Sequence, residues 1–60
     1  MIIYTGKSNT RNITIRICKD KSSKTPYSVS YRITDGGFFQ ELLKVDNLKD
    51  AYAYYNQLLV

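Results

Sequence analysis

Apolar and polar residues alternate along two segments in the first half of the chain. The segment 13–19 reads Ile-Thr-Ile-Arg-Ile-Cys-Lys, and the segment 27–34 reads Tyr-Ser-Val-Ser-Tyr-Arg-Ile-Thr. A period of two in β-branched and aromatic residues is typical of half-buried strands. The sequence therefore predicts strands over 13–19 and 27–34, joined by a polar loop. The polar positions that would share one face of this pair are Thr14, Arg16, Cys18, Ser28, Ser30 and Arg32.

Two further strands are predicted on either side of this pair. A short apolar run over 2–5 is closed by Gly6, and Asp35-Gly36-Gly37 is typical of a hairpin turn because glycine tolerates positive φ. A strand over 38–45 would follow that turn. The same residues could instead open a helix, but a turn before them and a helix start after them favour a strand.

The length of the hairpin turn decides which face each residue of this fourth strand occupies, since a slip of one residue exchanges the faces. A two-residue turn at Gly36-Gly37 places Arg32 opposite Glu41, on the face away from the core. A three-residue turn that includes Asp35 places Glu41 on the core face. The apolar residues that would accompany Glu41 there are Phe39, Leu43 and Val45. Both registers fit the sequence.

The end of the chain has a helical period. Asn47 can cap a helix, and Asp50, three residues on, favours the same start. The sequence predicts a helix over 47–59 with a single apolar stripe, from which Tyr54 is excluded. The stripe consists of Leu48, Ala51, Tyr52, Tyr55, Leu58 and Leu59.

These elements predict one α+β domain spanning residues 1–60. Its fold would be a four-stranded antiparallel β-meander with a C-terminal helix packed on one sheet face, in the order ββββα. This layering buries one face of the sheet and leaves the other open.

Composition removes several functional classes. The chain has no His and only one Cys, Cys18, so histidine-based catalysis, His-ligated metals and an internal disulfide are excluded. Four Asp residues fall at turns or at the helix start, and Glu41 is alone, so no acid–base pair is visible. We expect a protein that is not an enzyme and that needs no cofactor and no metal.

Basic residues gather in the first half of the chain. Residues 1–32 carry a net charge of +6 and residues 33–60 a net charge of −2, which together give +4. Arginine and hydroxyl side chains on one sheet face suit phosphate oxygens, so this pattern predicts a nucleic-acid interface. The alternative is a solvated face whose charges only block edge pairing. The candidate contact residues are Arg11, Arg16, Lys19, Lys21, Lys24 and Arg32.

The predicted fourth strand has apolar side chains on both faces. Exposed apolar surface commonly marks an interface, and sixty residues supply only a small core, so we expect a homodimer or a protein partner. Alternatively, a local bulge hides both apolar sets, or the segment is not a strand. The candidate interface residues are Phe38, Phe39, Leu42, Leu43 and Tyr54, with Tyr4 as a further residue able to stack on a base.

Strands followed by one helix, with a basic sheet, resemble the element order of single-strand-binding transcriptional coactivator domains. The segment Val45–Leu59 is also similar to the closing strand-to-helix step of the three-stranded domains found in plant transcription factors and phage integrase arms. The resemblance covers about a quarter of the chain and carries no residue's role with it.

Two functional hypotheses follow. The first is a nucleic-acid-binding module that uses the basic sheet face and loops. The second is a small regulator that blocks a host protein by steric occupation, as do the inhibitors carried by phages and mobile elements. No apolar run approaches membrane-spanning length and none has the form of a signal peptide, so we expect a cytoplasmic protein without membrane contact.

Overall fold

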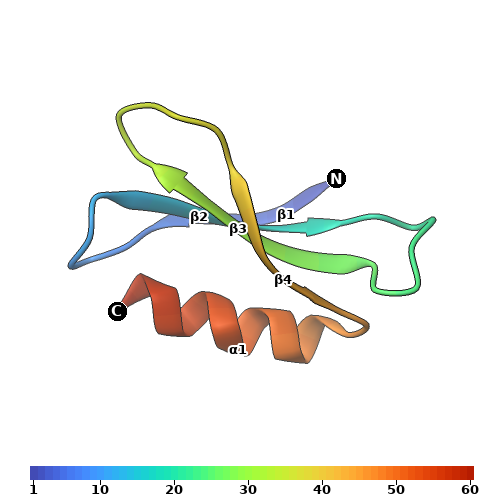
Figure 1. Cartoon of the computed structure of the whole chain (residues 1–60). Helices are drawn as coiled ribbons and strands as arrows, with labels where there is room; N and C mark the ends of the chain where they lie inside the picture. Colours follow the sequence, from blue (N-terminus) through green and yellow to red (C-terminus); the bar gives the residue numbers. More distant parts are fainter.

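The computed structural model describes all sixty residues, Met1–Val60, as four strands followed by one helix (Figure 1). This confirms the ββββα order expected from the hydrophobic pattern. The elements are β1 (Ile2–Lys7), β2 (Ile13–Lys19), β3 (Tyr27–Ile33), β4 (Gln40–Val45) and α1 (Leu48–Leu59).

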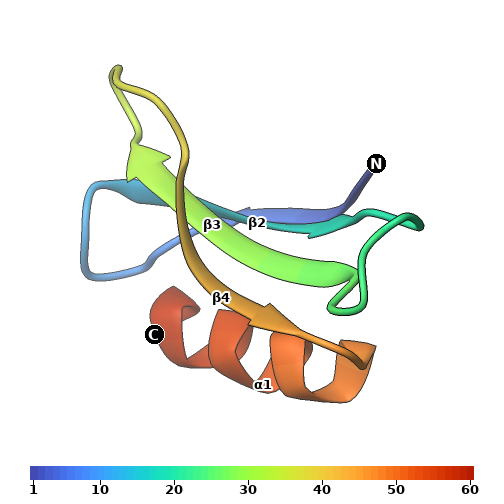
Figure 2. The same ribbon diagram turned by 45° about the vertical axis from the view of Figure 1, so that its right-hand side comes forward.

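The four strands form one antiparallel sheet in the order β1-β2-β3-β4. The helix lies across one face of the sheet, against β2, β3 and β4, and no element covers the opposite face (Figure 2). In the register of β2 and β3, Ile15 lies opposite Tyr31 and Ile17 opposite Val29. The alternating pattern therefore turns the isoleucines of β2 toward the helix, as predicted.

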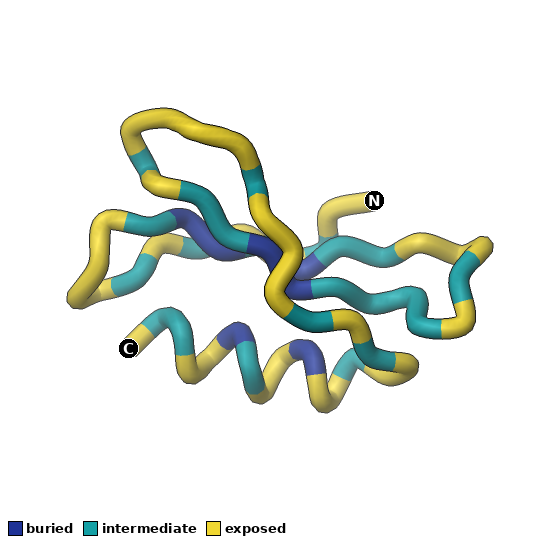
Figure 3. Tube along the Cα trace, viewed as in Figure 1, coloured by how far each residue is buried: buried dark blue, intermediate teal, exposed yellow.

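The core lies between the sheet and the helix and is small. Its buried positions run through the middle of β2 and β3 and along the sheet-facing side of α1 (Figure 3). Gly6 of β1 borders this core, because a Cβ at that position would come within 2.5 Å of the Tyr55 hydroxyl. The five buried apolar residues are Ile15, Ile17, Val29, Ala51 and Tyr55.

Asn47 caps the helix as predicted, since its side-chain oxygen accepts a hydrogen bond from the backbone N–H of Asp50. The β1–β2 loop holds the other end of the helix. The Asn9 N–H donates to the carbonyl of Leu59 at 2.9 Å, and the Thr10 hydroxyl donates to the carbonyl of Val60 at 2.9 Å. The single helix lacks the length and the apolar character that crossing a membrane requires.

The connection between β3 and β4 differs from the predicted hairpin. It spans 34–39, so neither a two-residue nor a three-residue turn is present. The turn closes early, where the Gly36 N–H donates to the carbonyl of Ile33 at 3.1 Å, and Gly37 then adopts a φ of 87°. Positive φ at Gly37 agrees with the reason for expecting glycine there.

A bulge in β4 makes each predicted register correct for only part of the strand. Leu43 and Val45 face the core, as the three-residue turn predicts, and Glu41 faces away from it, as the two-residue turn predicts. Phe39, which the three-residue turn also assigns to the core face, lies instead against Arg16 on the other side of the sheet.

Leu43 lies opposite Val29 on the helix side, while Glu41 lies opposite Ser30 on the other side, which leaves Leu42 as the extra residue. Inserting one residue exchanges the faces on either side of it. The bulge therefore turns Leu43 to the core and keeps the carboxylate of Glu41 away from it.

Ile33 is exposed, although the sequence assigns it to the core face. Its partner in β2 is Ile13, at the end of the sheet where the helix stops, and Ile33 is 59% exposed. The alternation correctly gives the side of the sheet on which this residue lies. It carries no information about how far the helix extends along that side.

Candidate nucleic-acid interface

The sheet face opposite the helix, called the open face below, is strongly polar. Cross-strand register places Thr14 between Lys7 and Arg32, and Arg16 beside Ser30. Four basic residues and one acidic residue share this face. Its members across the four strands are Ile2, Thr5, Lys7, Thr14, Arg16, Cys18, Ser28, Ser30, Arg32, Glu41 and Lys44.

Phe39 brings the two arginines of the open face together. The Cζ atom of Arg16 lies 3.7 Å from the centroid of the Phe39 ring, and the Cζ atom of Arg32 lies 5.2 Å from it. Both distances are within the range of a cation–π contact. One aromatic ring, in the segment just before β4, thus contacts two guanidinium groups from neighbouring strands.

Neither guanidinium group has an anionic partner in the protein. The only ion pair joins Lys44 to Glu41 at 4.0 Å, and neither arginine side chain makes a hydrogen bond. The Nε atoms of Arg16 and Arg32 are buried without a partner, so the donors left for a ligand are the Nη groups. Each arginine therefore retains unused donors on an uncovered surface.

Small hydroxyl residues lie beneath these side chains. Thr14 is 9% exposed and Ser30 is 7% exposed, although both lie on the open face. In register they are neighbours of Arg32 and Arg16, whose long side chains reach over the strand surface. The Thr14 hydroxyl also makes a 3.1 Å hydrogen bond with the hydroxyl of Thr34. The arginines thus rest on a packed polar layer.

The positive charge of the arginine pair is not compensated by Glu41, which pairs with Lys44 instead. The bulge puts Glu41 and Lys44 on the same face although they are three residues apart, and their side chains are about half exposed. An exposed pair of this kind contributes little stability. The one carboxylate on the open face is therefore engaged with a lysine at the β4 edge.

The structure separates the six basic candidates into three places. Arg16 and Arg32 lie together on the open face, whereas the β2–β3 loop carries Lys21 and Lys24 at one end of the sheet (Figure 1). Lys19 lies beside that loop, its Nζ atom 5.5 Å above the ring centroid of Tyr27. The last of the six, Arg11, is in the β1–β2 loop at the opposite end.

At the β2–β3 end, Met1 joins the lysines. Its terminal ammonium group donates to the carbonyl of Lys19 at 3.0 Å, and Lys21 lines the same open hollow of about 310 Å³. Asp20 also lines it, and hydrogen bonds from the hydroxyl and backbone N–H of Ser22 lower the pKa of this carboxyl below its ordinary value. This end therefore mixes positive charge with a firmly ionised carboxylate.

The apolar candidates are also divided. Phe38 is 93% exposed and Leu42 is 41% exposed, whereas Phe39 is half-buried beneath the arginines. Leu43 and Tyr54 are half-buried and pack against the core. Only Phe38 and Leu42 thus offer substantial apolar surface.

A second hollow, of about 270 Å³, lies on the helix side of the sheet. Four apolar or aromatic residues and one arginine line it: Ile13, Tyr31, Leu42, Leu58 and Arg11. The bulge exposes Leu42 here while Leu43 remains packed against the core. This hollow is separate from the open face and is mainly apolar.

Tyr4 is part of an aromatic cluster on the helix side. Its ring centroid lies 5.3 Å from that of Tyr52 and 6.2 Å from that of Tyr55. Tyr4 and Tyr52 remain 42% and 43% exposed. These rings support one another across β1 and α1, away from the arginine pair.

No group of three or more His, Cys, Asp or Glu side chains could hold a metal ion. Cys18 is a free, half-buried thiol on the open face. Sequence patterns gave no sign that Phe39 organises the two arginines, because that contact depends on the loop before β4. Lys44 is not among the predicted contact residues either, and the bulge is what places it on the same face as Glu41.

Comparison with known proteins reveals no relative. No protein-family model matches the chain, and no curated protein or solved structure is significantly similar to it.

Proposed function

We propose that this protein binds nucleic acid, using the open face of its sheet. The observation that carries the proposal is the arginine pair, Arg16 and Arg32, held on the ring of Phe39 without any carboxylate partner. Guanidinium groups offer several donors in a planar fork, which suits the oxygens of a phosphodiester. The proposal keeps the cytoplasmic location expected from the sequence.

The surroundings of the pair support a backbone contact rather than the reading of base sequence. Lys7 and Lys44 lie on the same face, at its two outer strands, and extend the positive surface to both edges. Such contacts position a protein on nucleic acid without selecting sequence. Between two and four phosphate contacts predict a log–log salt slope of roughly −1.4 to −2.8 on a single strand.

Fluorescence anisotropy with labelled DNA and RNA, at several salt concentrations, tests the proposal. Arg16→Gln and Arg32→Gln should each weaken binding and reduce the salt slope by about 0.7 on a single strand. Arg11→Gln is the matched control, because it removes the same charge outside the open face. Equal losses from Arg11→Gln and Arg16→Gln would show that only total charge matters. No binding by the wild type at low salt would refute the proposal.

A second candidate function is binding to a protein through the hollow beside Leu42. The observation in its favour is a mainly apolar lining that includes one arginine, in a region where Ile33 is also exposed. A partner protein, or a second copy of this chain, could bury an apolar side chain there. Light scattering after nuclease treatment reports the oligomeric state, and pull-down with Leu42→Glu as the negative control reports a foreign partner. Unchanged recovery with Leu42→Glu would exclude this surface.

A further inference from the structure

Phe38 is the most exposed large apolar residue of the molecule. It is 93% exposed, although the next residue in the chain is half-buried and stacked with the arginines. A free aromatic ring loses the benefit of burial, and nothing in the core requires one here. This contrast between adjacent phenylalanines is the feature that needs a physical explanation.

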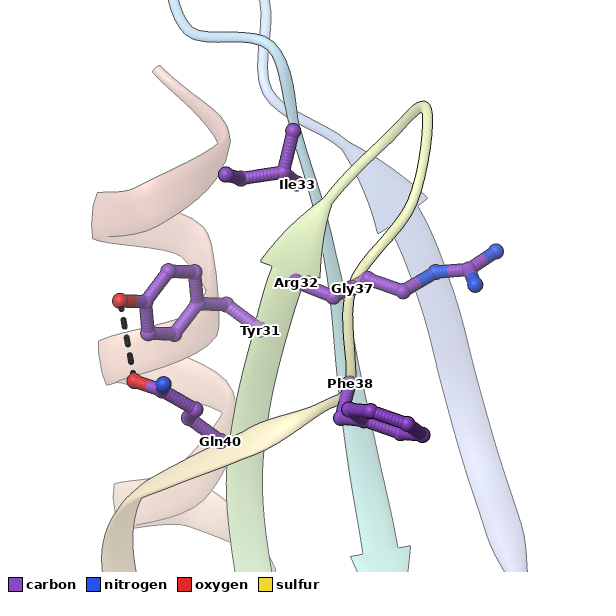
Figure 4. A pocket seen from close by; sticks show the side chains of 6 residues that line it. All are labelled: Tyr31, Arg32, Ile33, Gly37, Phe38 and Gln40. Carbon is purple, nitrogen blue, oxygen red and sulfur yellow. Dashed lines mark hydrogen bonds between the residues drawn. The ribbon is translucent and has the colours of Figure 1, made fainter.

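A hollow of about 130 Å³ connects Phe38 to Arg32, one member of the arginine pair. Arg32, Gly37 and Phe38 contribute to its lining, with Tyr31, Ile33 and Gln40 completing it. Figure 4 shows Tyr31 and Gln40 pointing toward the helix, while Arg32 and Phe38 point away from it. The exposed ring and one guanidinium group thus share the side of the chain on which the open face lies.

From this arrangement we infer that the ligand is single-stranded, with an unpaired base stacked on Phe38 while its phosphates contact Arg16 and Arg32. The inference rests on the proposed function and adds the class of nucleic acid. A ring beside a cationic surface is the combination by which proteins hold single strands without reading their sequence. A duplex keeps its bases stacked on each other, so it leaves the face of Phe38 unused.

The other aromatic candidates do not share this placement. Tyr54 packs against the core, and the Tyr4 ring contacts Tyr52 and Tyr55 on the helix side. A base stacked on Tyr4 would therefore lie across the sheet from the arginine pair. Phe38 is the only exposed aromatic ring that lines a hollow with one of the two arginines.

Binding of a short oligo(dT) strand and of a duplex of equal length, measured side by side, tests the inference. Phe38→Ala should weaken oligo(dT) binding by roughly tenfold while leaving its salt slope unchanged, because stacking involves no charge. Duplex binding should stay as it is in the wild type. The matched control is Val60→Ala, which shortens another exposed apolar side chain outside this hollow and should change neither affinity.

Phe38→Trp provides a direct readout. The chain contains no Trp, so the new indole is the sole tryptophan reporter, and stacking of a base on it should quench its fluorescence. Because Phe38 has almost no contacts to lose, both variants should fold, which circular dichroism verifies. Phe38→Ala binding oligo(dT) as tightly as the wild type would overturn the inference, as would equal losses for strand and duplex. A wild type that binds neither probe refutes the proposed function as well, which separates the two failures.

Discussion

The two faces of the sheet are covered by different kinds of contact. The helix-side face packs Ile15, Ile17 and Val29 against α1 and excludes water almost completely. The open face has no covering element, yet Arg16 and Phe39 close over its centre by stacking. The first arrangement depends on apolar area and the second on the contact between a cation and a ring.

Because of this difference, the helix-side face supplies most of the stability, while the polar groups of the open face stay accessible. Removing apolar area from water is the main stabilising contribution in a small domain, and here it is confined to one side of the sheet. The open face contributes little by comparison and keeps its donors available. A chain of sixty residues can therefore leave a polar sheet face uncovered only because the opposite face supplies most of its stability.

The largest test of this comparison is a pair of neighbouring substitutions in β2. Ile17→Ala should lower the free energy of unfolding by about 2–5 kcal/mol, a large part of the roughly 3–9 kcal/mol expected for this length. Arg16→Ala, one residue away on the open face, should cost only about 0.5–1 kcal/mol. Urea unfolding followed by circular dichroism measures both. Similar losses from the two variants would mean that both faces stabilise the fold equally.

Gly6→Ala tests the tightness of the helix-side face. A Cβ at this position would lie 2.5 Å from the Tyr55 hydroxyl and 3.0 Å from Cδ2 of Leu59. Overpacking of this kind should cost about 1–3 kcal/mol. Tyr55→Phe removes the closest atom. Gly6→Ala should therefore lower the free energy of unfolding by less in the Tyr55→Phe background than in the wild type. An additive double variant would contradict this contact.

Phe39→Leu tests the open face directly. The substitution keeps an apolar side chain but removes the ring under Arg16 and Arg32, so we expect stability to fall by about 0.5–1 kcal/mol. Phe38→Leu is the matched control and should leave the unfolding midpoint unchanged, because Phe38 is already exposed. If the two leucine variants unfold alike, the stacked arrangement adds nothing to the fold.

Much of the fold follows from local patterns in the sequence. Alternation in β2 reproduces its bounds, Ile13–Lys19, and the cap at Asn47 correctly marks where the helix begins. These elements are predictable because their side chains repeat with one period and their ends carry specific hydrogen-bonding residues. The face occupied by each residue of β2 and β3 follows from the same alternation.

The remainder depends on contacts between distant segments. The Leu42 bulge interrupts the period of β4, and the 34–39 loop allows Phe39 to fold back over β2 and β3. Neither feature leaves a local signature, because a bulge becomes visible only in the pairing with another strand. The sequence therefore predicts both arginines of the candidate site and Phe39 as an interface residue, but not the contact that brings the two arginines to the Phe39 ring.

The smallest expected effect is an alkaline one that belongs to the helix-side face alone. Burial raises the pKa of Tyr55 above its ordinary value of 10.0, and the neighbouring Tyr52 and Tyr4 add to the shift. Above pH 10 the unfolded chain therefore loses this proton more readily than the folded one. The folded state binds more protons in that window, so stability falls as the pH rises through it.

Urea unfolding of the wild type and Tyr55→Phe, at pH 8 and at successive values above 10, isolates this contribution. Phe cannot ionise, so the variant should lose less stability over the same range, whatever other groups titrate. Phe39→Leu should keep the steeper decline of the wild type, because it leaves Tyr55 and its neighbours Tyr52 and Tyr4 unchanged. Parallel declines in the wild type and Tyr55→Phe would show that the Tyr55 hydroxyl is as free to ionise in the folded protein as in the unfolded chain.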